Sequence, residues 1–245
     1  MRIRLGRVVA SRVALLLGVV LVLAGGAAQP ATGELLYRAG DFNGGYTFGY
    51  EAPNGNYYRY FKDFQVPANE QWIVSSVGNV TVLGLHTLEQ LTSARLEIRS
   101  GITVNNGGTL LAGENRPVVS TTFLTSVGNG PAYDYTVDLS QPLVLGPGLY
   151  YATLQPISPD LNNWFTGFTS GANAVGGPPI DGLSFQHSVF GSVIGNYIQV
   201  NNREPAITIY GTRIPEPGGL LAAGVAILAA TARFRRTTPL LVLTD

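Results

Sequence analysis

The chain has 245 residues, and its 15 basic and 15 acidic side chains balance to a formal net charge of zero. Charged residues make up only 12% of the chain, about half of the roughly 25% found in ordinary globular domains. Cysteine is absent, which excludes a disulfide framework and cysteine-based metal sites, so the fold must rest on its core.

The first 28 residues have the composition of a secretory signal peptide. Four arginines, the last at Arg12, form a basic N-terminal region. An apolar stretch follows over 13–23, and residues 24–28 are small. Gly26 and Ala28 fit the small-x-small pattern of a cleavage site, so we expect the cut after Ala28. The sequence therefore predicts export through the general secretory translocon, with an uncleaved N-terminal anchor as the alternative.

The balanced charge of the whole chain hides an acidic central part. Four arginines lie in 1–28 and three beyond residue 230, and Glu216 and Asp245 also lie outside the central part, which leaves 8 basic against 13 acidic residues in 29–215. Nucleic-acid binding depends on neutralising phosphates, so this surplus of acidic residues argues against nucleic acid as a partner.

Residues 34–212 have the pattern of one β domain. Apolar and polar side chains alternate over 94–99, which places Leu96 and Ile98 on one face, and they alternate again over 133–139. Turn sequences rich in Gly and Pro separate further β-rich runs at 71–77, 80–85, 148–154 and 206–210. Residues 85–93 have room for one helical turn. Short strands at this spacing predict an all-β, antiparallel sandwich.

Three segments of this domain resemble segments of known proteins. They are 58–67 followed by Trp72, 94–99 followed by Gly101, and 142–151. Their strands, Pro-Gly turn and paired aromatics resemble a module common in exported bacterial sandwich domains, over about residues 57–168. The resemblance implies a jelly-roll-like fold and an exported setting, and it carries no set of catalytic residues.

The sequence offers little enzyme chemistry. It has no Gly-x-Ser-x-Gly, no Gly-rich phosphate loop and no His-Glu-x-x-His. His86 and His187 are the only histidines, and neither has a neighbour at metal-ligand spacing, so we expect loop or interior imidazoles.

Two acidic residues on one strand do not have the spacing of a glycosidase pair. Asp134 and Asp138 share a strand face, but four residues of strand put them about 13 Å apart, whereas a glycosidase pair needs roughly 5–9.5 Å. We therefore predict a protein that is not an enzyme. The alternative is a polysaccharide-modifying enzyme, of the glycoside hydrolase or lyase type, whose site is assembled from carboxylates on distant strands.

The arrangement of several aromatic side chains in the sequence predicts a surface that contacts carbohydrate. Tyr46 shares a strand face with Phe48 and Tyr50, Tyr57 belongs to the next segment, and Trp164 lies in an Asn-rich loop. Aromatic faces beside amides suit sugar rings, because they combine apolar contact with hydrogen bonding. The alternative is that these rings pack in the core or along an edge strand.

Two loops offer oxygen ligands for a structural Ca²⁺. Asp41 and Asn43 precede a Gly-Gly turn, and Asp160, Asn162 and Asn163 share another loop. Neither forms a twelve-residue EF-hand loop with its terminal Glu, so ordinary Asx turns are the alternative for both. We expect no other cofactor.

The last part of the chain has three successive features. They are Pro215, Glu216 and Pro217, then an apolar run over 218–232, then Arg233, Arg235 and Arg236. The prolines predict an extended, accessible segment rather than a helix or a central strand. The apolar run is shorter than the roughly 20 residues of a spanning helix, and the arginines suit the cytoplasmic side of a membrane. We expect transient membrane retention by a short helix, followed by processing.

This order of features resembles the PEP-CTERM sorting signal of Gram-negative bacteria. The resemblance assigns 213–236 to the signal and leaves 237–245 as a short tail beyond the usual end. It implies that an integral-membrane exosortase recognises Pro215-Glu216-Pro217 and cuts nearby, and that export is coupled to production of extracellular polysaccharide.

Together these patterns predict a non-enzymatic protein exported through the inner membrane. We expect it at the cell surface or in the extracellular matrix, as a structural component or one associated with extracellular polysaccharide. A scaffold without any small ligand is the alternative.

The mature surface form is expected to lack everything beyond about Pro217, because sorting would end in cleavage near the Pro-Glu-Pro motif. Intact mass and C-terminal peptide mapping of surface material measure this directly. Peptides ending at Asp245 in the surface form would contradict the assignment.

Overall fold

A computed structural model describes residues 33–52, 54–158, 164–177, 184–190, 193–201 and 203–215. The chain divides into two compact units, Met1–Gly33 and Glu34–Asp245. The expected signal peptide, apolar run and C-terminal arginines lie outside the described residues, as do Glu216, Pro217 and the second calcium loop with Asp160 and Asn162. The described residues include no helix with the length and apolar character needed to cross a bilayer.

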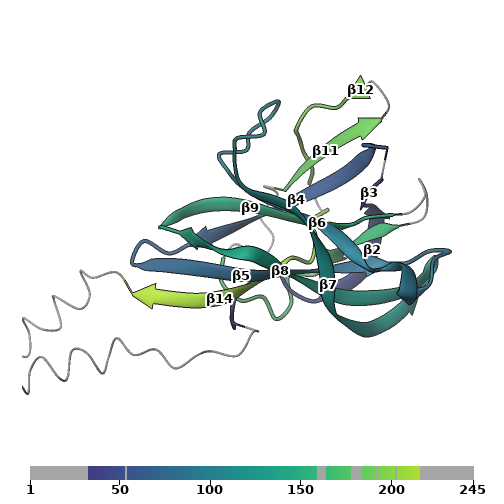
Figure 1. Cartoon of the computed structure of the whole chain (residues 1–245), viewed down its shortest axis with the longest axis horizontal. Helices are drawn as coiled ribbons and strands as arrows, with labels where there is room; N and C mark the ends of the chain where they lie inside the picture. Colours follow the sequence, from purple (N-terminus) through teal and green to yellow (C-terminus); the bar gives the residue numbers. More distant parts are fainter. Residues whose placement is uncertain are drawn as a thin grey trace, which may run out of the picture. The chain divides into compact units, whose positions relative to one another are not determined.

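Strands make up most of the described part of the second unit (Figure 1). The first half contains β1 (Glu34–Arg38), β2 (Phe42–Phe48), β3 (Tyr50–Glu51), β4 (Tyr57–Val66), β5 (Glu70–Val82), the 3₁₀ turn η1 (Leu88–Gln90) and β6 (Ser93–Ser100). The second half contains β7 (Thr109–Val127), β8 (Gly130–Leu145), β9 (Gly148–Pro156), β10 (Phe165–Thr169), β11 (Phe185–Phe190), β12 (Val193–Ile194), β13 (Ile198–Gln199) and β14 (Thr208–Pro215).

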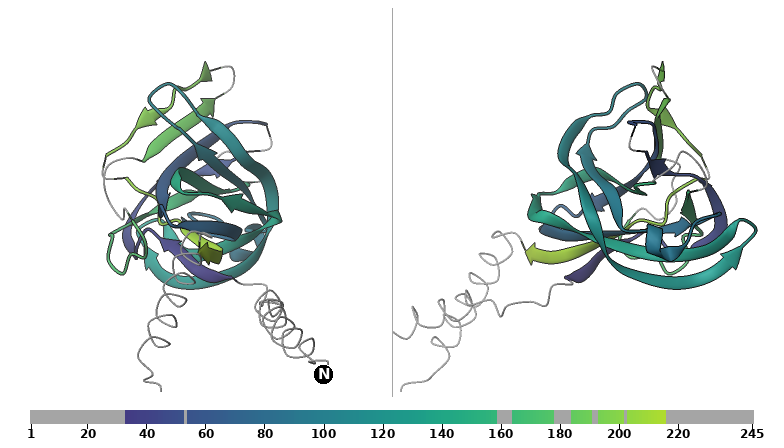
Figure 2. Two further views of the ribbon diagram at one scale, coloured as in Figure 1. Left: turned by 90° about the vertical axis from the view of Figure 1, so that its left-hand side faces the viewer. Right: turned by 45° about the vertical axis from the view of Figure 1, so that its right-hand side comes forward.

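All these strands join one sheet whose main path is β1-β14-β5-β8-β7-β6-β9-β4-β11-β12. Their pairing is antiparallel throughout, which confirms the predicted all-β class. The long strand β7 pairs with β6 along its first half and with β8 along its second half. It thereby carries the sheet from one layer into the other, and the sheet curls round on itself (Figure 2).

The main core lies between the layer with β14, β5 and β8 and the layer with β6, β9 and β4. Leu96 and Ile98 of β6 face Tyr135 and Val137 of β8 within one fully buried cluster. These four side chains follow the alternation expected for 94–99 and 133–139, so both sequence patterns are confirmed. Burying each such side chain contributes about 1.5–3 kcal/mol, so alternation is the main local reason for the sheet.

The strand expected at 71–77 and the one expected at 80–85 form a single strand, β5. Gly78 between them pairs with Thr208 on one side and Thr136 on the other, so the ladder continues. The buried amide of Asn79 donates to the Leu154 carbonyl at 2.8 Å, which satisfies a polar group inside the core. The helical turn expected over 85–93 is confirmed by η1.

The last strand extends further than the sequence pattern predicts. β14 runs to Pro215, three residues past the expected domain end at 212, and Pro215 pairs with Glu70. β1 begins opposite Gly211, so β14 has only β5 as a strand neighbour after that point. A proline without an N–H is tolerated at such an edge, so the segment is extended and exposed without being a central strand, as the prolines predict.

Gly211 is required by a close backbone approach within this strand. A Cβ at this position would lie 2.0 Å from the Ile73 carbonyl oxygen, and the pairing register shifts at the same place. A side chain would therefore force the two strands apart.

Two groups of charged side chains are buried within the sheet layers. Glu97 of β6 is only 2% exposed and contacts Arg59 at 2.8 Å, Arg99 at 2.8 Å and Arg95 at 3.0 Å. Lys62 is fully buried and contacts Asp63 at 2.6 Å and Glu204 at 2.9 Å. Because buried charges must be paired, each group ties its strands to a defined arrangement.

The Glu97 cluster also links stability to pH. Burial alone raises the pKa of the Glu97 carboxyl, but Arg59, Arg99 and Arg95 outweigh burial and hold this pKa below its ordinary value of 4.5. The stability that the cluster contributes is therefore fully present above about pH 4.5 and is lost as the pH falls below it.

Glu97→Gln is expected to lower the free energy of unfolding by about 3–5 kcal/mol, because three guanidinium groups lose the charge that compensates them. Urea unfolding followed by tryptophan fluorescence at pH 7 measures this. Glu34→Gln is the matched control, since Glu34 forms an exposed pair with Arg213 at 3.6 Å, and its change should stay below about 1 kcal/mol. Equal effects of the two substitutions would contradict the assigned role of Glu97.

Candidate functional site

The three residues expected to contact carbohydrate lie in different environments. Tyr46 is half-buried on β2. Tyr57 lies beneath the Arg59 guanidinium, 3.8 Å from its ring centre, and its hydroxyl contacts His187 Nδ1 at 2.9 Å. Trp164 is completely buried and stacks against His86 with ring centres 4.9 Å apart. Its ring cannot reach a sugar, so the expected contact at Trp164 is wrong; the residue turns inward as the chain enters β10.

His187 is an interior imidazole, as the sequence predicts. Burial lowers its pKa, and the neighbouring Arg59 acts in the same direction, so the ring is neutral near pH 7. Its Nδ1 lies within hydrogen-bond distance of the Tyr57 hydroxyl, and its ring also bonds to the backbone of Gly195. The imidazole therefore serves to hold β11 against β4.

A continuous row of aromatic rings lies on β2, β10, β4 and β11, and we call it the aromatic strip. Its ring centres are 5.2 Å apart from Tyr46 to Phe165, 5.1 Å from Phe165 to Phe48, 6.4 Å from Phe48 to Tyr58 and 5.4 Å from Tyr58 to Phe190. These separations fall in the range of favourable edge-to-face and offset contacts, so each ring helps to fix the next.

The aromatic strip is partly open to solvent. Phe48 is 48% exposed and Phe190 is 45% exposed, whereas Phe165 beneath them is 6% exposed. Beyond Phe165 lies a shallow cavity of about 310 Å³, whose walls also include Leu85 and Asn129. Exposed aromatic faces fixed by a buried ring, with an amide close by, form the type of surface that the sequence predicted for sugar binding.

Sequence reasoning found Tyr46 and Phe48 of the strip but missed Phe165 and Phe190. These two rings meet β2 and β4 only through long-range strand pairing, with Phe165 opposite Phe48 and β11 beside β4. No local sequence pattern predicts which strands these two segments pair with.

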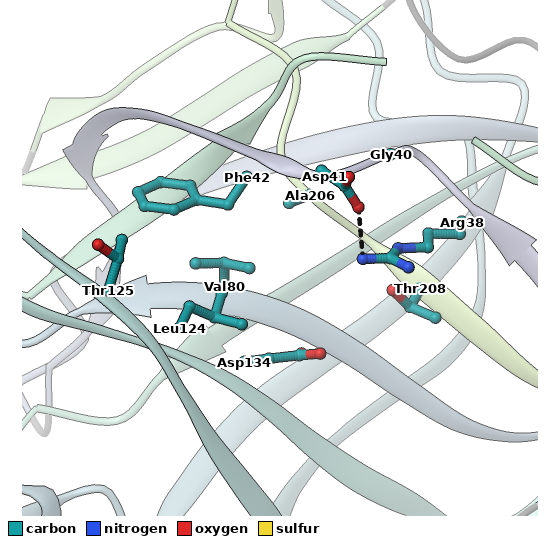
Figure 3. A pocket seen from close by; sticks show the side chains of 10 residues that line it. All are labelled: Arg38, Gly40, Asp41, Phe42, Val80, Leu124, Thr125, Asp134, Ala206 and Thr208. Carbon is teal, nitrogen blue, oxygen red and sulfur yellow. Dashed lines mark hydrogen bonds and ion pairs between the residues drawn. The ribbon is translucent and has the colours of Figure 1, made fainter. Parts of the chain in front are cut away.

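A second concave site of about 290 Å³ lies where β1 leads into β2 (Figure 3). One wall is apolar and comes from Phe42, Val80, Leu124 and Ala206. The other end carries polar groups from Arg38, Asp41, Asp134, Thr208 and Thr125. We call this site the β1–β2 pocket. It brings together side chains from β1, β2, β5, β7, β8 and β14.

The acidic residue Asp41 of the β1–β2 pocket has protein partners on both oxygens. Its carboxylate pairs with Arg38 at 2.7 Å and accepts from the Asn173 amide at 2.6 Å. Asn43, the other calcium ligand expected in this loop, accepts from the Gly45 N–H at 2.7 Å and donates to the Thr169 carbonyl at 2.9 Å. The loop therefore forms an Asx turn, the alternative stated above for this segment. The described residues contain no group of three acidic, His or Cys side chains placed for a metal.

Asp134 is the unusual group of the β1–β2 pocket. Its carboxylate points toward the end where Arg38 and Thr208 lie (Figure 3). Burial raises its pKa to about 6, and the nearby Arg38 only partly opposes this effect. Within the described residues Asp134 forms no ion pair. A carboxyl with a raised pKa in a cavity marks a candidate binding or catalytic group.

The aromatic strip and the β1–β2 pocket border the same small apolar cluster. This cluster contains Val80, Val82, Ala132, Phe165 and Ala206, with Phe42 and Tyr46 of β2 against it. Strand β2 thus contributes to both sites. No protein family, curated protein or solved structure matches the chain.

Asp134→Asn is expected to stabilise the protein at pH 7. One pKa unit corresponds to about 1.4 kcal/mol, so a carboxyl with a pKa of about 6 when folded and 3.8 when unfolded loses about 3 kcal/mol as the pH rises through that interval. The substitution should recover roughly 1–3 kcal/mol at pH 7 and almost none at pH 4.

Chemical unfolding at both pH values measures this difference. Asp138→Asn, on the same strand face and hydrogen-bonded to Ser76 at 2.7 Å, is the control and should give no gain at pH 7. An Asp134→Asn variant no more stable at pH 7 than the parent chain would contradict the raised pKa.

Proposed function

We propose that this protein is an exported, non-enzymatic surface or extracellular-matrix component that associates with extracellular polysaccharide. The observation that carries the proposal is the aromatic strip. Phe48 and Phe190 offer apolar faces to solvent, and Tyr46 and Tyr58 supply rings with hydroxyl groups beside them. Sugar rings have one apolar face and a rim of hydroxyls, so this surface suits a glycan chain lying along β2 and β11.

The proposed fold is a jelly-roll-like sandwich, which the curled antiparallel sheet with a core between two layers supports. Export would use the N-terminal signal. Sorting would follow from retention by the apolar run and the arginines, and then from recognition of Pro215-Glu216-Pro217 by an exosortase. The resemblance of the last part of the chain to PEP-CTERM signals supports this order of events.

A polysaccharide-modifying enzyme is the second candidate. The observation that favours it is the β1–β2 pocket, which brings Asp41 from the connection between β1 and β2 and Asp134 from β8 into one cavity. Their environments differ, because Arg38 pairs with Asp41 while burial keeps the pKa of Asp134 near 6. Two carboxyl groups with different environments are the usual arrangement of acid and base roles in glycan cleavage.

Phe48→Ala and Phe190→Ala are each expected to weaken binding of residues 34–214 to extracellular polysaccharide by roughly fivefold to tenfold, which is on the order of 1 kcal/mol per ring. Retardation in native gels that contain the host polysaccharide measures the affinity, and reducing ends are assayed in the same samples. Phe123→Ala is the matched control, because Phe123 is 56% exposed on β7 but lies outside the aromatic strip.

Retardation without release of reducing ends, lost in the two strip variants and kept in Phe123→Ala, is the expected result. Release of reducing ends that Asp134→Asn abolishes would replace the binding proposal with the enzyme. Absence of both effects would leave a scaffold protein without a glycan ligand.

A further inference from the structure

The β1–β2 pocket has the shape and lining of a site for one small ring-shaped ligand. Its volume of about 290 Å³ lies at the lower limit of ligand pockets, which span about 300–1,000 Å³. Phe42 and Val80 line its apolar wall, and Leu124 extends that wall across from β7 (Figure 3). A ligand that fills the pocket must therefore present one apolar face and a separate polar edge.

The polar end of the pocket has an excess of negative charge. Arg38 is paired with Asp41 at 2.7 Å, so its charge is already balanced. Asp134 lines the same pocket and forms no ion pair among the described residues. Thr208 and Thr125 add neutral hydroxyl groups to the lining. The pocket therefore offers one uncompensated carboxylate, which a cationic group on the ligand would neutralise.

The geometry points to a binding site for an amino sugar with a free amine. The apolar face of the pyranose ring would lie on Phe42 and Val80, and the ammonium group would pair with Asp134. Hydroxyl groups next to the ammonium group would reach Arg38 and Thr208 at the same polar end of the pocket. This inference rests on the proposed function, because it names the unit of the polysaccharide that the protein selects.

The preference for an amino sugar over a neutral sugar is expected to depend on pH. The charged and titratable groups that face Asp134 are Arg38 from β1, Asp41 in the connection to β2, and Tyr210 from β14. Burial raises the pKa of the Tyr210 phenol and the charge of Asp134 raises it further, so Tyr210 remains neutral across the range considered. Asp134, with a pKa of about 6, changes charge between pH 5 and pH 7 and controls the pairing.

Isothermal titration of the full-length chain with glucosamine, glucose and N-acetylglucosamine tests the inference. At pH 7 glucosamine should bind about tenfold more tightly than the two neutral sugars, because only its ammonium group can form an ion pair with the Asp134 carboxylate. At pH 5 the preference should fall to about twofold, because most Asp134 carboxyl groups are protonated there.

Asp134→Asn should bind all three sugars equally, whereas Asp138→Asn should keep the preference for glucosamine. Butylamine, which carries an ammonium group without a sugar ring, should bind more weakly than glucosamine. Equal binding of the three sugars by the parent chain, no measurable binding, a preference that survives Asp134→Asn, or butylamine as tight as glucosamine would each overturn the inference.

This titration is independent of the aromatic strip. A single sugar occupies the β1–β2 pocket alone. If Phe48→Ala and Phe190→Ala leave polysaccharide binding unchanged, the proposed function fails, but the preference for glucosamine can still be observed. Loss of the preference with intact dependence on the strip would overturn the amino-sugar site and leave the proposed function in place.

Discussion

The register of β5 is the constraint on which the rest of the structure depends. This strand pairs with β14 on one side and with β8 on the other, and its end also pairs with β10. Trp72, Val74 and Val77 supply the main core, while Val80 on the opposite face of the strand lines the β1–β2 pocket. A shift of one residue would exchange these faces, so the same hydrogen bonds define both the core and the pocket.

Buried charged side chains hold other strands together in a chain that contains no cysteine. The cluster around Glu97 joins β6 to β4 through Arg59, and Lys62 joins β4 to the segment before β14 through Glu204. Asp134 has the opposite effect, since a partly buried carboxylate that forms no ion pair among the described residues weakens the folded state at neutral pH. Groups that reduce stability and face a cavity are typical of binding sites, where a ligand supplies the missing partner.

Local sequence patterns predict the strands well because alternation is a short-range signal. Leu96, Ile98, Tyr135 and Val137 lie in the core as their spacing indicates, and the turn near Leu88 forms where expected. The same signal fails at Gly78, where pairing on both sides keeps one strand continuous.

The candidate sites depend on long-range pairing, which alternation does not encode. Phe165 reaches Phe48 because β10 pairs with β2. Asp134 and Arg38 line one pocket although β5 and β14 separate their strands in the sheet. Trp164 shows the same limit: its Asn-rich surroundings indicate a surface loop, yet its ring stacks on His86 inside the core. Burial of a loop residue depends on which segment packs over it.

The end of β14 at Pro215 has a consequence for the order of folding and processing. The strand pairs of residues 213–215 with Trp72, Gln71 and Glu70 complete the sheet. A cut at about Pro217 would fall two residues after the final pair and would remove no pairing of β14. The precursor and the trimmed protein would then share one sheet, so the domain could complete its folding before it reaches the peptidase. If the proposed cleavage occurs, the peptidase would have to accept a folded strand that ends two residues before the scissile bond in the sequence.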